Sequence, residues 1–287
     1  MKPHQECGAC LVHWVFERAA PYIPEERAIE LVRHIVKILL RDVSPESNVG
    51  LICNNTVHAA FDTTPGLSLY YEDLKQKSNQ NAKKVLPEAI EYINKERSME
   101  GRLARACLLA AAANVAPLNA PSSPYTFKEI SEFIFHDNLR GAIIGNLIEA
   151  VKSSNSVLYV TDNAGEIGFD SLVMHLIKEI GAKITLVVKK QTFFEDATMD
   201  DAHNFNLEEL VDDIVTVPGF MVPDGIDSNT KKYFYSSDLI IAKGTGSYEA
   251  LHEEIPQKKA VFMLKVKCRP IARELGMGEG NIIVNVE

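Results

Sequence analysis

The C-terminal half of the chain contains a series of short apolar, β-prone segments separated by helical or polar stretches. The first two lie at residues 157–161 and 184–188, with a helical stretch at 169–180 and Gly181 between them. Further segments follow at residues 214–217, 239–242, 260–264 and 282–286. Because apolar side chains occupy both parities, these strands suit a sheet covered on both faces. The pattern predicts an α/β fold with a Rossmann-like, doubly wound sheet, in which ligands bind at the carboxyl ends of strands.

The N-terminal half shows helical periodicity instead. An amphipathic run follows Pro24, and similar runs are expected at residues 71–95, 101–115 and 126–153. Proline-rich residues 117–124 separate two of these runs. We therefore expect a helical N-terminal part at residues 1–150 and an α/β Rossmann-like metal-binding core at residues 151–287.

Charge and hydropathy narrow the class of partner. The 287 residues carry a net charge of -9, which repels phosphate backbones, so we expect no nucleic-acid partner. No uncharged segment reaches the ~20 residues of a membrane span, and the charged stretch from Met1 to Cys10 does not resemble a secretory signal. These observations favour a cytoplasmic protein and leave the oligomeric state open. They do not exclude a small phosphorylated metabolite as partner, because a local metal ion and a few lysines can invert the field within one pocket.

The motif Asp162-Asn163-Ala164-Gly165-Glu166 stands where the first strand should end and a helix begin. Asp162 and Asn163 offer adjacent oxygen ligands that suit a hard or borderline divalent cation, and Gly165 permits a tight turn. Glu166 is a candidate supporting carboxylate or general base. The alternative is an ordinary turn with a helix cap, since Asp and Asn are preferred caps.

Asp196 follows the second strand as Asp162 follows the first. If the two strands are neighbours, Asp162, Asn163 and Asp196 can hold one metal ion and leave positions open for water and substrate. Helix capping is again the alternative, either by Asp196 or by Thr198.

Two later segments offer groups for a phosphate. Residues 242–249 place Gly244 and Gly246 at a strand-to-helix turn, where backbone N–H groups can face an anion and Lys243 adds positive charge. Lys265 and Lys267 follow another predicted strand, and either could anchor a phosphate. Each segment has a plainer interpretation, a common glycine turn or two solvated lysines on an edge strand.

The cysteines suggest a separate possibility. Cys7 and Cys10 form a Cys-x-x-Cys pair that can bind zinc or take part in redox chemistry, and Cys268 could complete such a site. Zinc normally needs four ligands, and a second Cys-x-x-Cys pair is absent from the sequence. The odd count of five cysteines does not suggest a disulfide framework.

Taken in order, these motifs resemble the metal-dependent damage-control phosphatases, in the archaeal and bacterial branch with an N-terminal Cys-x-x-Cys. The resemblance covers nearly the whole chain and implies hydrolysis of small phosphometabolites, such as sugar phosphates or damaged intermediates of cofactor synthesis, with manganese, nickel, cobalt or magnesium. It places the metal ligands on Asp162, Asn163 and Asp196, and the motif lysines on Lys243 and Lys265. Asn114 matches a family Gly-Asn motif whose glycine and nearby aspartate are missing here, so the substrate preference is expected to differ.

The sequence thus predicts metal-assisted hydrolysis. The proposed catalytic residues are Asp162, Glu166, Lys243 and Lys265, and the proposed substrate-binding residues are Asn114, Gly244, Gly246 and Lys267. Direct attack by Asp162 on phosphorus is disfavoured, because phosphatases of that type place a second aspartate where this chain has Ala164. Two rival functions stay open: an S-adenosylmethionine-dependent carboxyl methyltransferase, and a non-catalytic metal or redox module built on Cys7 and Cys10.

Overall fold

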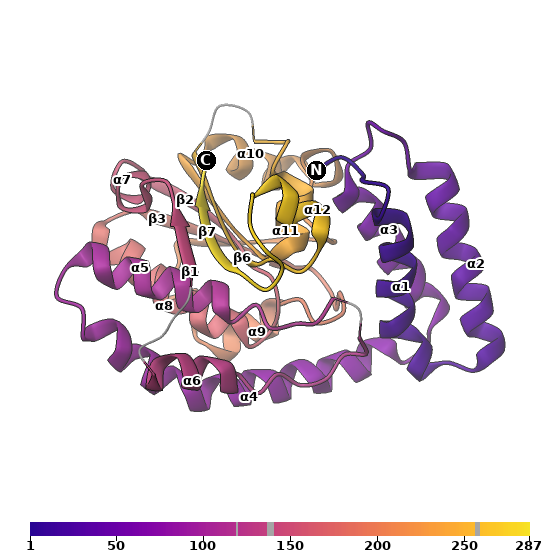
Figure 1. Ribbon diagram of the computed structural model, residues 1–287, viewed down its shortest axis with the longest axis horizontal. Coiled ribbons are helices and arrows are strands. Elements are labelled where there is room, and N and C mark those ends of the chain that lie inside the picture. The colour runs from indigo at the N-terminus through magenta and orange to yellow at the C-terminus, as the bar shows by residue number, and fades with distance from the viewer. Residues whose placement is uncertain (119, 137–140, 256–258) are drawn as a thin grey trace.

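The computed structural model describes residues 1–118, 120–136, 141–255 and 259–287, which form a mixed sheet with helices on both faces (Figure 1). The strands are β1 (Gly141–Ile144), β2 (Ser156–Val160), β3 (Lys183–Lys189), β4 (Asp213–Val217), β5 (Leu239–Lys243), β6 (Lys259–Lys265) and β7 (Ile282–Val286). The helices of the N-terminal half are α1 (Cys7–Ala19), α2 (Glu25–Asp42), α3 (Val49–Thr63), α4 (Leu67–Asn94), α5 (Met99–Ala112) and α6 (Lys128–Phe135). Those that follow β1 are α7 (Leu147–Lys152), α8 (Glu166–Ile180), α9 (Met199–Asn204), α10 (Ser228–Ser236), α11 (Gly244–Leu251) and α12 (Arg269–Glu274), with short 3-10 turns at 20–22, 207–209 and 223–225.

The strand order places the reversal of the chain at the centre of the sheet. The order is β1-β7-β6-β5-β2-β3-β4. From β2 the chain moves outward through β3 and β4, and it then returns to β5 on the other side of β2. These strands and β6 are parallel to one another. Strand β7 runs antiparallel to β6, and β1 pairs in parallel with β7. The carboxyl ends of β2 and β5 therefore flank a topological switch point, the usual ligand site of such sheets.

Two apolar layers cover the sheet, in agreement with apolar residues on both parities of its strands. On one face Tyr159 and Ile241 pack with α4, α5 and α8. On the other face Leu158 and Ile240 pack with α1, α3 and α11. The predicted α/β class with a doubly wound sheet and N-terminal helices is confirmed.

The prediction of one helical run at residues 126–153 is wrong. That stretch contains α6, the edge strand β1 and α7 instead. Residues 141–144 pair in parallel with β7, and the Asn146 side chain caps α7 by accepting a hydrogen bond from the Glu149 amide. Strand pairing at the sheet edge overrides the local helical pattern here. The expected division at residue 150 stays a prediction, although β1 precedes that residue and belongs to the sheet.

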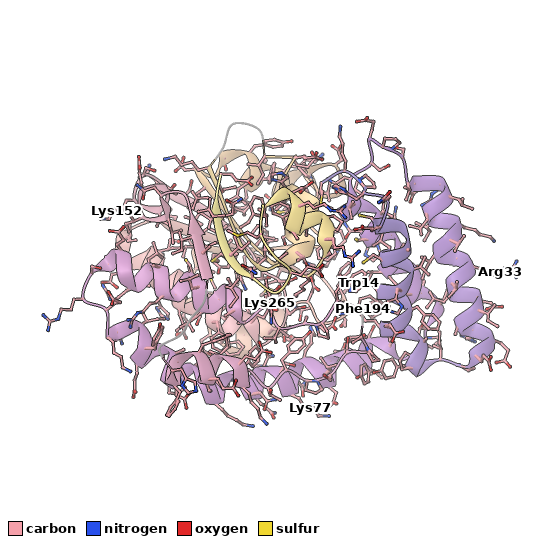
Figure 2. All side chains as sticks on the ribbon, in the orientation of Figure 1. Trp14, Arg33, Lys77, Lys152, Phe194 and Lys265 are labelled. Atoms are coloured by element: carbon pink, nitrogen blue, oxygen red, sulfur yellow. The ribbon has the colours of Figure 1, made fainter. Side chains whose placement is uncertain are left out.

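The helices α1, α2 and α3 form a layer beside the carboxyl ends of the strands (Figure 1). Trp14 of α1 meets Phe194 of the β3–α9 loop edge-to-face, with ring centroids 5.4 Å apart (Figure 2). Helices α3 and α11 pack so closely that a Cβ added at Gly50 would lie only 2.6 Å from Ala250 Cβ. Among the described residues, no helix combines the length and apolar character needed to cross a membrane.

Candidate functional site

The loop after β2 is held against the loop after β3 by backbone hydrogen bonds. The Asp162 carbonyl accepts from Ala197 N at 2.8 Å, and Ala164 N donates to the Glu195 carbonyl at 2.8 Å. Asn163 and Asp196 form an isolated antiparallel bridge. The three predicted metal ligands therefore lie together, because neighbouring parallel strands end at the same edge.

Helix α4 fixes the turn that leads into α8. Gly165 has a φ of +77°, and its amide donates to Asn79 Oδ1 at 2.7 Å. A Cβ at this position would lie 2.8 Å from the Phe127 ring, so glycine is required on both conformational and steric grounds. The expected role of Gly165 in a tight turn agrees with this geometry.

Asn114 ties the first motif to the end of α5. Its Nδ2 donates to Asp162 Oδ2 at 2.6 Å and to Glu166 Oε1 at 2.9 Å. Asn163 Nδ2 also donates to Glu166 Oε1, at 2.7 Å. With both amide nitrogens turned to Glu166, this carboxylate orients Asn114 and Asn163. Burial, reinforced by the charge of Asp162 and opposed by Lys243, raises the pKa of Glu166 to about 8.

Asp196 completes the acidic wall and has a basic neighbour that the sequence reasoning did not assign to the site. Its Oδ2 lies 3.0 Å from Nζ of Lys189, the last residue of β3, and both side chains are buried. Burial raises the pKa of the Asp196 carboxyl to about 7, with Asp162 adding to the effect and Lys189 opposing it. The sequence did offer a sign that Lys189 belongs to the site, because this residue lies at a strand end directly before the loop of Asp196.

Lys243 lies beneath the first motif, fully buried. Its Nζ is 3.2 Å from Glu166 Oε2 and 3.0 Å from Asp170 Oδ1, and Tyr159 OH donates to the same Asp170 oxygen. Burial alone would lower the pKa of Lys243, but Asp170 and Glu166 raise it, so the amine stays charged and paired. Sequence reasoning missed Asp170, which lies one helical turn after Glu166 on the same face of α8.

Gly244 begins α11 directly after β5 and approaches Asp162 closely. It has a φ of +80°, and a Cβ there would lie 2.0 Å from Asp162 Oδ2. Only glycine permits this approach, which brings the first N–H groups of α11 toward the acidic loop. Gly246, one of the predicted substrate-binding residues, lines the cavity beside that loop.

The two lysines predicted to bind phosphate, Lys265 at the end of β6 and Lys267 just after it, differ in whether they line the cavity. Lys265 Nζ pairs with Glu129 Oε2 at 3.3 Å, outside the acidic cluster (Figure 2). Lys267 lines the cavity with Asp162, and among the described residues no ion pair joins its amine to a carboxylate. Burial lowers the pKa of Lys267, while the charges of Asp162 and Glu166 oppose that effect. Lys267, rather than Lys265, is therefore the lysine that faces the site.

An Arg–Glu pair connects the helical layer to the same cavity. Arg18 Nε of α1 lies 3.2 Å from Glu195 Oε2, and both side chains are buried. The Arg18 guanidinium also donates to the Pro117 carbonyl at 2.7 Å and to the Leu118 carbonyl at 3.0 Å. Ser122 provides a further hydrogen bond to Glu195. Sequence reasoning missed Arg18, whose place in an amphipathic helix gives no sign of its distant partner.

These groups surround a small cavity of about 50 Å³. Its wall combines carboxylates, an amide, a lysine and the start of α11, and includes Asp162, Asn163, Glu195, Asp196, Thr245, Gly246 and Lys267. Carboxylates and an amine that line one cavity suit a cation and an anion placed side by side. Asn114, Glu166, Lys243 and Gly244 stand behind this wall and hold it in place.

The donor set fits a hard divalent cation. Asp162, Asn163 and Asp196 line one cavity, and carboxylate and amide oxygens are ligands that suit such an ion. Within the described part of the chain, no three His, Cys, Asp or Glu side chains form a cation site by themselves. The candidate set accordingly depends on the Asn163 amide oxygen as its third donor.

The cysteines of the predicted second site line a larger cavity next to the first. Cys7, Cys10 and Cys268 share its wall with Cys53. Burial raises the pKa of Cys10 to about 11 and that of Cys268 to about 12, so these thiols are protonated near neutral pH. In the described ranges they do not form a metal-holding group, so a metal or redox role for them stays a prediction.

Comparison with known proteins gives a consistent result. Residues 4–283 match the model of the damage-control phosphatase ARMT1-like domain. The chain is 30% identical over 292 residues to an uncharacterized protein of Methanocaldococcus jannaschii, with 99% of this chain and 95% of the relative covered. It is 29% identical to a damage-control phosphatase of Archaeoglobus fulgidus (100% and 99% covered) and 29% identical to one of Pyrococcus horikoshii (99% and 97% covered).

A solved structure has the same fold. The crystal structure of a DUF89 family protein from Pyrococcus horikoshii aligns with a TM-score of 0.80 and 24% sequence identity. The alignment covers 99% of this chain and 98% of that one. The resemblance extends over the N-terminal helices as well as the sheet.

Proposed function

Because the chain belongs to the family of damage-control phosphatases with an ARMT1-like domain, we propose that it is a divalent-metal-dependent phosphatase acting on small phosphate monoesters in the cytoplasm. One observation carries the proposal. Asp162, Asn163 and Asp196 line the same small cavity as Lys267, at the switch point of the sheet. Sugar phosphates and damaged intermediates of cofactor synthesis are the candidate substrates.

In this proposal Asp162, Asn163 and Asp196 hold the ion, with manganese, nickel, cobalt and magnesium as the candidates. When bound, such an ion polarises a phosphoryl oxygen and lowers the pKa of a water molecule. Glu166 keeps the two asparagine amides oriented, and Lys243 keeps Glu166 in place through its ion pair at 3.2 Å. Both are positioning residues, because neither lines the cavity.

Lys267 and the start of α11, which line the same cavity as the carboxylates, receive the phosphoryl group. Lys267 offsets its negative charge, and the backbone N–H groups at the start of α11, around Thr245 and Gly246, donate hydrogen bonds. The role that sequence analysis gave to Lys265 passes to Lys267. Trp14, Pro117 and Leu118 close the cavity from the helical side, so bulk water is partly excluded.

The proposal is tested by phosphate release from p-nitrophenyl phosphate and a panel of sugar phosphates. The protein is stripped with a chelator and then supplied with each of the four ions. We expect release only with metal, and a loss of at least about a hundredfold in Asp162→Asn, which keeps the side-chain shape but removes its charge. Activity after complete chelation, or an unaffected Asp162→Asn variant, contradicts the proposal, and S-adenosylmethionine binding then becomes the next measurement.

A further inference from the structure

A second cavity, larger and mainly apolar, adjoins the small one. Its volume is about 350 Å³, within the usual range for small-molecule sites. The two cavities share wall residues from five separate segments of the chain: Trp14, Leu118, Phe220, Thr245, Gly246 and Lys267. A molecule whose phosphate lies between Lys267 and the start of α11 therefore has its remaining atoms directed into the larger space.

The chemistry of the larger cavity differs from that of a sugar site. Six of the wall residues that do not also line the small cavity are apolar or weakly polar: Cys7, Cys10, Leu11, Val49, Cys53 and Pro270. Burial raises the pKa of each of the three thiols among them, so they present neutral, polarisable S–H groups. Against these six side chains a hydroxyl-rich group would lose hydrogen bonds to water without replacing them.

The charged residues of the wall exclude a second anion. Three carboxylates, Glu6, Glu249 and Glu279, line the cavity away from the phosphate end. The one arginine there, Arg269, lies 3.7 Å from Glu279 and is largely exposed. A bisphosphate or a phosphorylated acid would bring negative charge against these carboxylates.

Resting on the proposed function, we propose that this cavity binds the alcohol part of the substrate, and that it narrows the candidate substrates to phosphate monoesters whose alcohol part is apolar or aromatic, so that sugar phosphates are disfavoured. The recognition is hydrophobic, with Trp14 and Phe220 at the junction of the two cavities and the cysteines in the wall of the larger one.

The test uses alkyl phosphonates, which cannot be hydrolysed, in calorimetric titrations of the manganese-supplied protein. Hexylphosphonate is expected to bind at least roughly tenfold more tightly than ethylphosphonate, since each buried methylene adds severalfold. In Cys10→Phe and in Val49→Phe, which fill the cavity from α1 and from α3, the ratio of the two affinities is expected to fall toward one. His13→Phe places the same side chain on the exposed side of α1, outside the cavity, and is expected to keep the ratio.

Equal affinities in the wild type, or a ratio that neither filling variant changes, would overturn the inference. Hydrolysis of ethyl and hexyl phosphate is measured in the same samples, because their leaving groups have similar chemistry. A retained preference for hexylphosphonate without any phosphate release contradicts the phosphatase proposal and supports the cavity assignment. Phosphate release without a chain-length preference supports the phosphatase proposal and contradicts the cavity assignment.

Discussion

At the scale of single residues, the site separates groups that face the cavity from groups that hold them. Asp162, Asn163 and Asp196 face it, whereas Glu166 and Lys243 are buried behind them. The buried charges of Glu166, Lys243, Asp196 and Lys189 are compensated within the protein, since each has an opposite charge or an amide within hydrogen-bonding distance. Lys267 is the exception, because no carboxylate pairs with it among the described residues, and it is therefore available to an anion.

This difference between lysines gives a direct prediction. Lys267→Met is expected to lower kcat/KM by about 10²–10³-fold, the usual cost of removing a group that stabilises developing charge. Lys265→Met removes the same charge two residues away, where the amine pairs with Glu129, and is expected to stay near the wild-type value. Steady-state kinetics with p-nitrophenyl phosphate compare the two. A larger loss in Lys265→Met would contradict the assignment.

The sequence was sufficient to bring the acidic motifs together, because Asp162 and Asp196 each follow a strand of one parallel sheet. It was insufficient to choose between Lys265 and Lys267. In a continuing strand residues 265 and 267 would share one face, so the choice depends on β6 ending at Lys265. Arg18 and Asp170 were missed for a related reason, since their partners become neighbours only through tertiary packing.

At the scale of elements, the junction of β5 and α11 sets the precision of the site. The strand passes into the helix at Gly244 without an intervening loop, so the first amides of α11 lie beside Asp162. A conventional loop would move the positive end of the helix dipole away from the anion.

Gly244→Ala is expected to disrupt the site. The added methyl group meets Asp162 Oδ2 at 2.0 Å, and the positive φ costs about 1–2 kcal/mol for any other residue. We expect at least a tenfold loss of manganese affinity, roughly the scale seen when metal ligands lose their orientation. Gly276→Ala is the matched control, because Gly276 has a φ of +63° in open space. Its stability should fall similarly in denaturant titrations while its metal affinity is retained.

The local pattern of apolar residues predicted most elements of the α/β half, because apolar residues recur with different periods in strands and in helices. It failed at residues 126–153, because β1 is a four-residue edge strand whose identity comes from pairing with β7. A short segment with apolar residues such as Ile143 and Ile144 fits a helix equally well until its partner is known.

At the scale of the whole molecule, the N-terminal helices form one wall of the site. Helix α1 contributes Trp14 to both cavities and Arg18 to the ion pair with Glu195. The Arg18 guanidinium also binds the carbonyls that follow α5, so three distant segments meet at one side chain. The helical part and the sheet are therefore linked energetically at the wall of the candidate site.

Arg18→Met tests this link. It leaves the Glu195 carboxylate buried without its cation, which typically costs about 3–5 kcal/mol in the free energy of unfolding. Arg33→Met on the exposed side of α2 is the control, with a change within about 0.5 kcal/mol (Figure 2). Urea denaturation of both variants gives the comparison. Equal stabilities would show that the Arg18–Glu195 pair does not connect the two parts.

The central claim is that Asp162, Asn163 and Asp196 hold a divalent ion on which phosphate release depends. The most direct measurement is calorimetric titration of the metal-free protein with manganese, with phosphate release followed in the same samples. The wild type and Asp200→Ala, which removes an exposed carboxylate of α9, are expected to bind the ion and to gain activity as it binds. Asp196→Ala is expected to lose both. If Asp196→Ala binds manganese with wild-type affinity and releases phosphate at the wild-type rate, the metal site lies elsewhere.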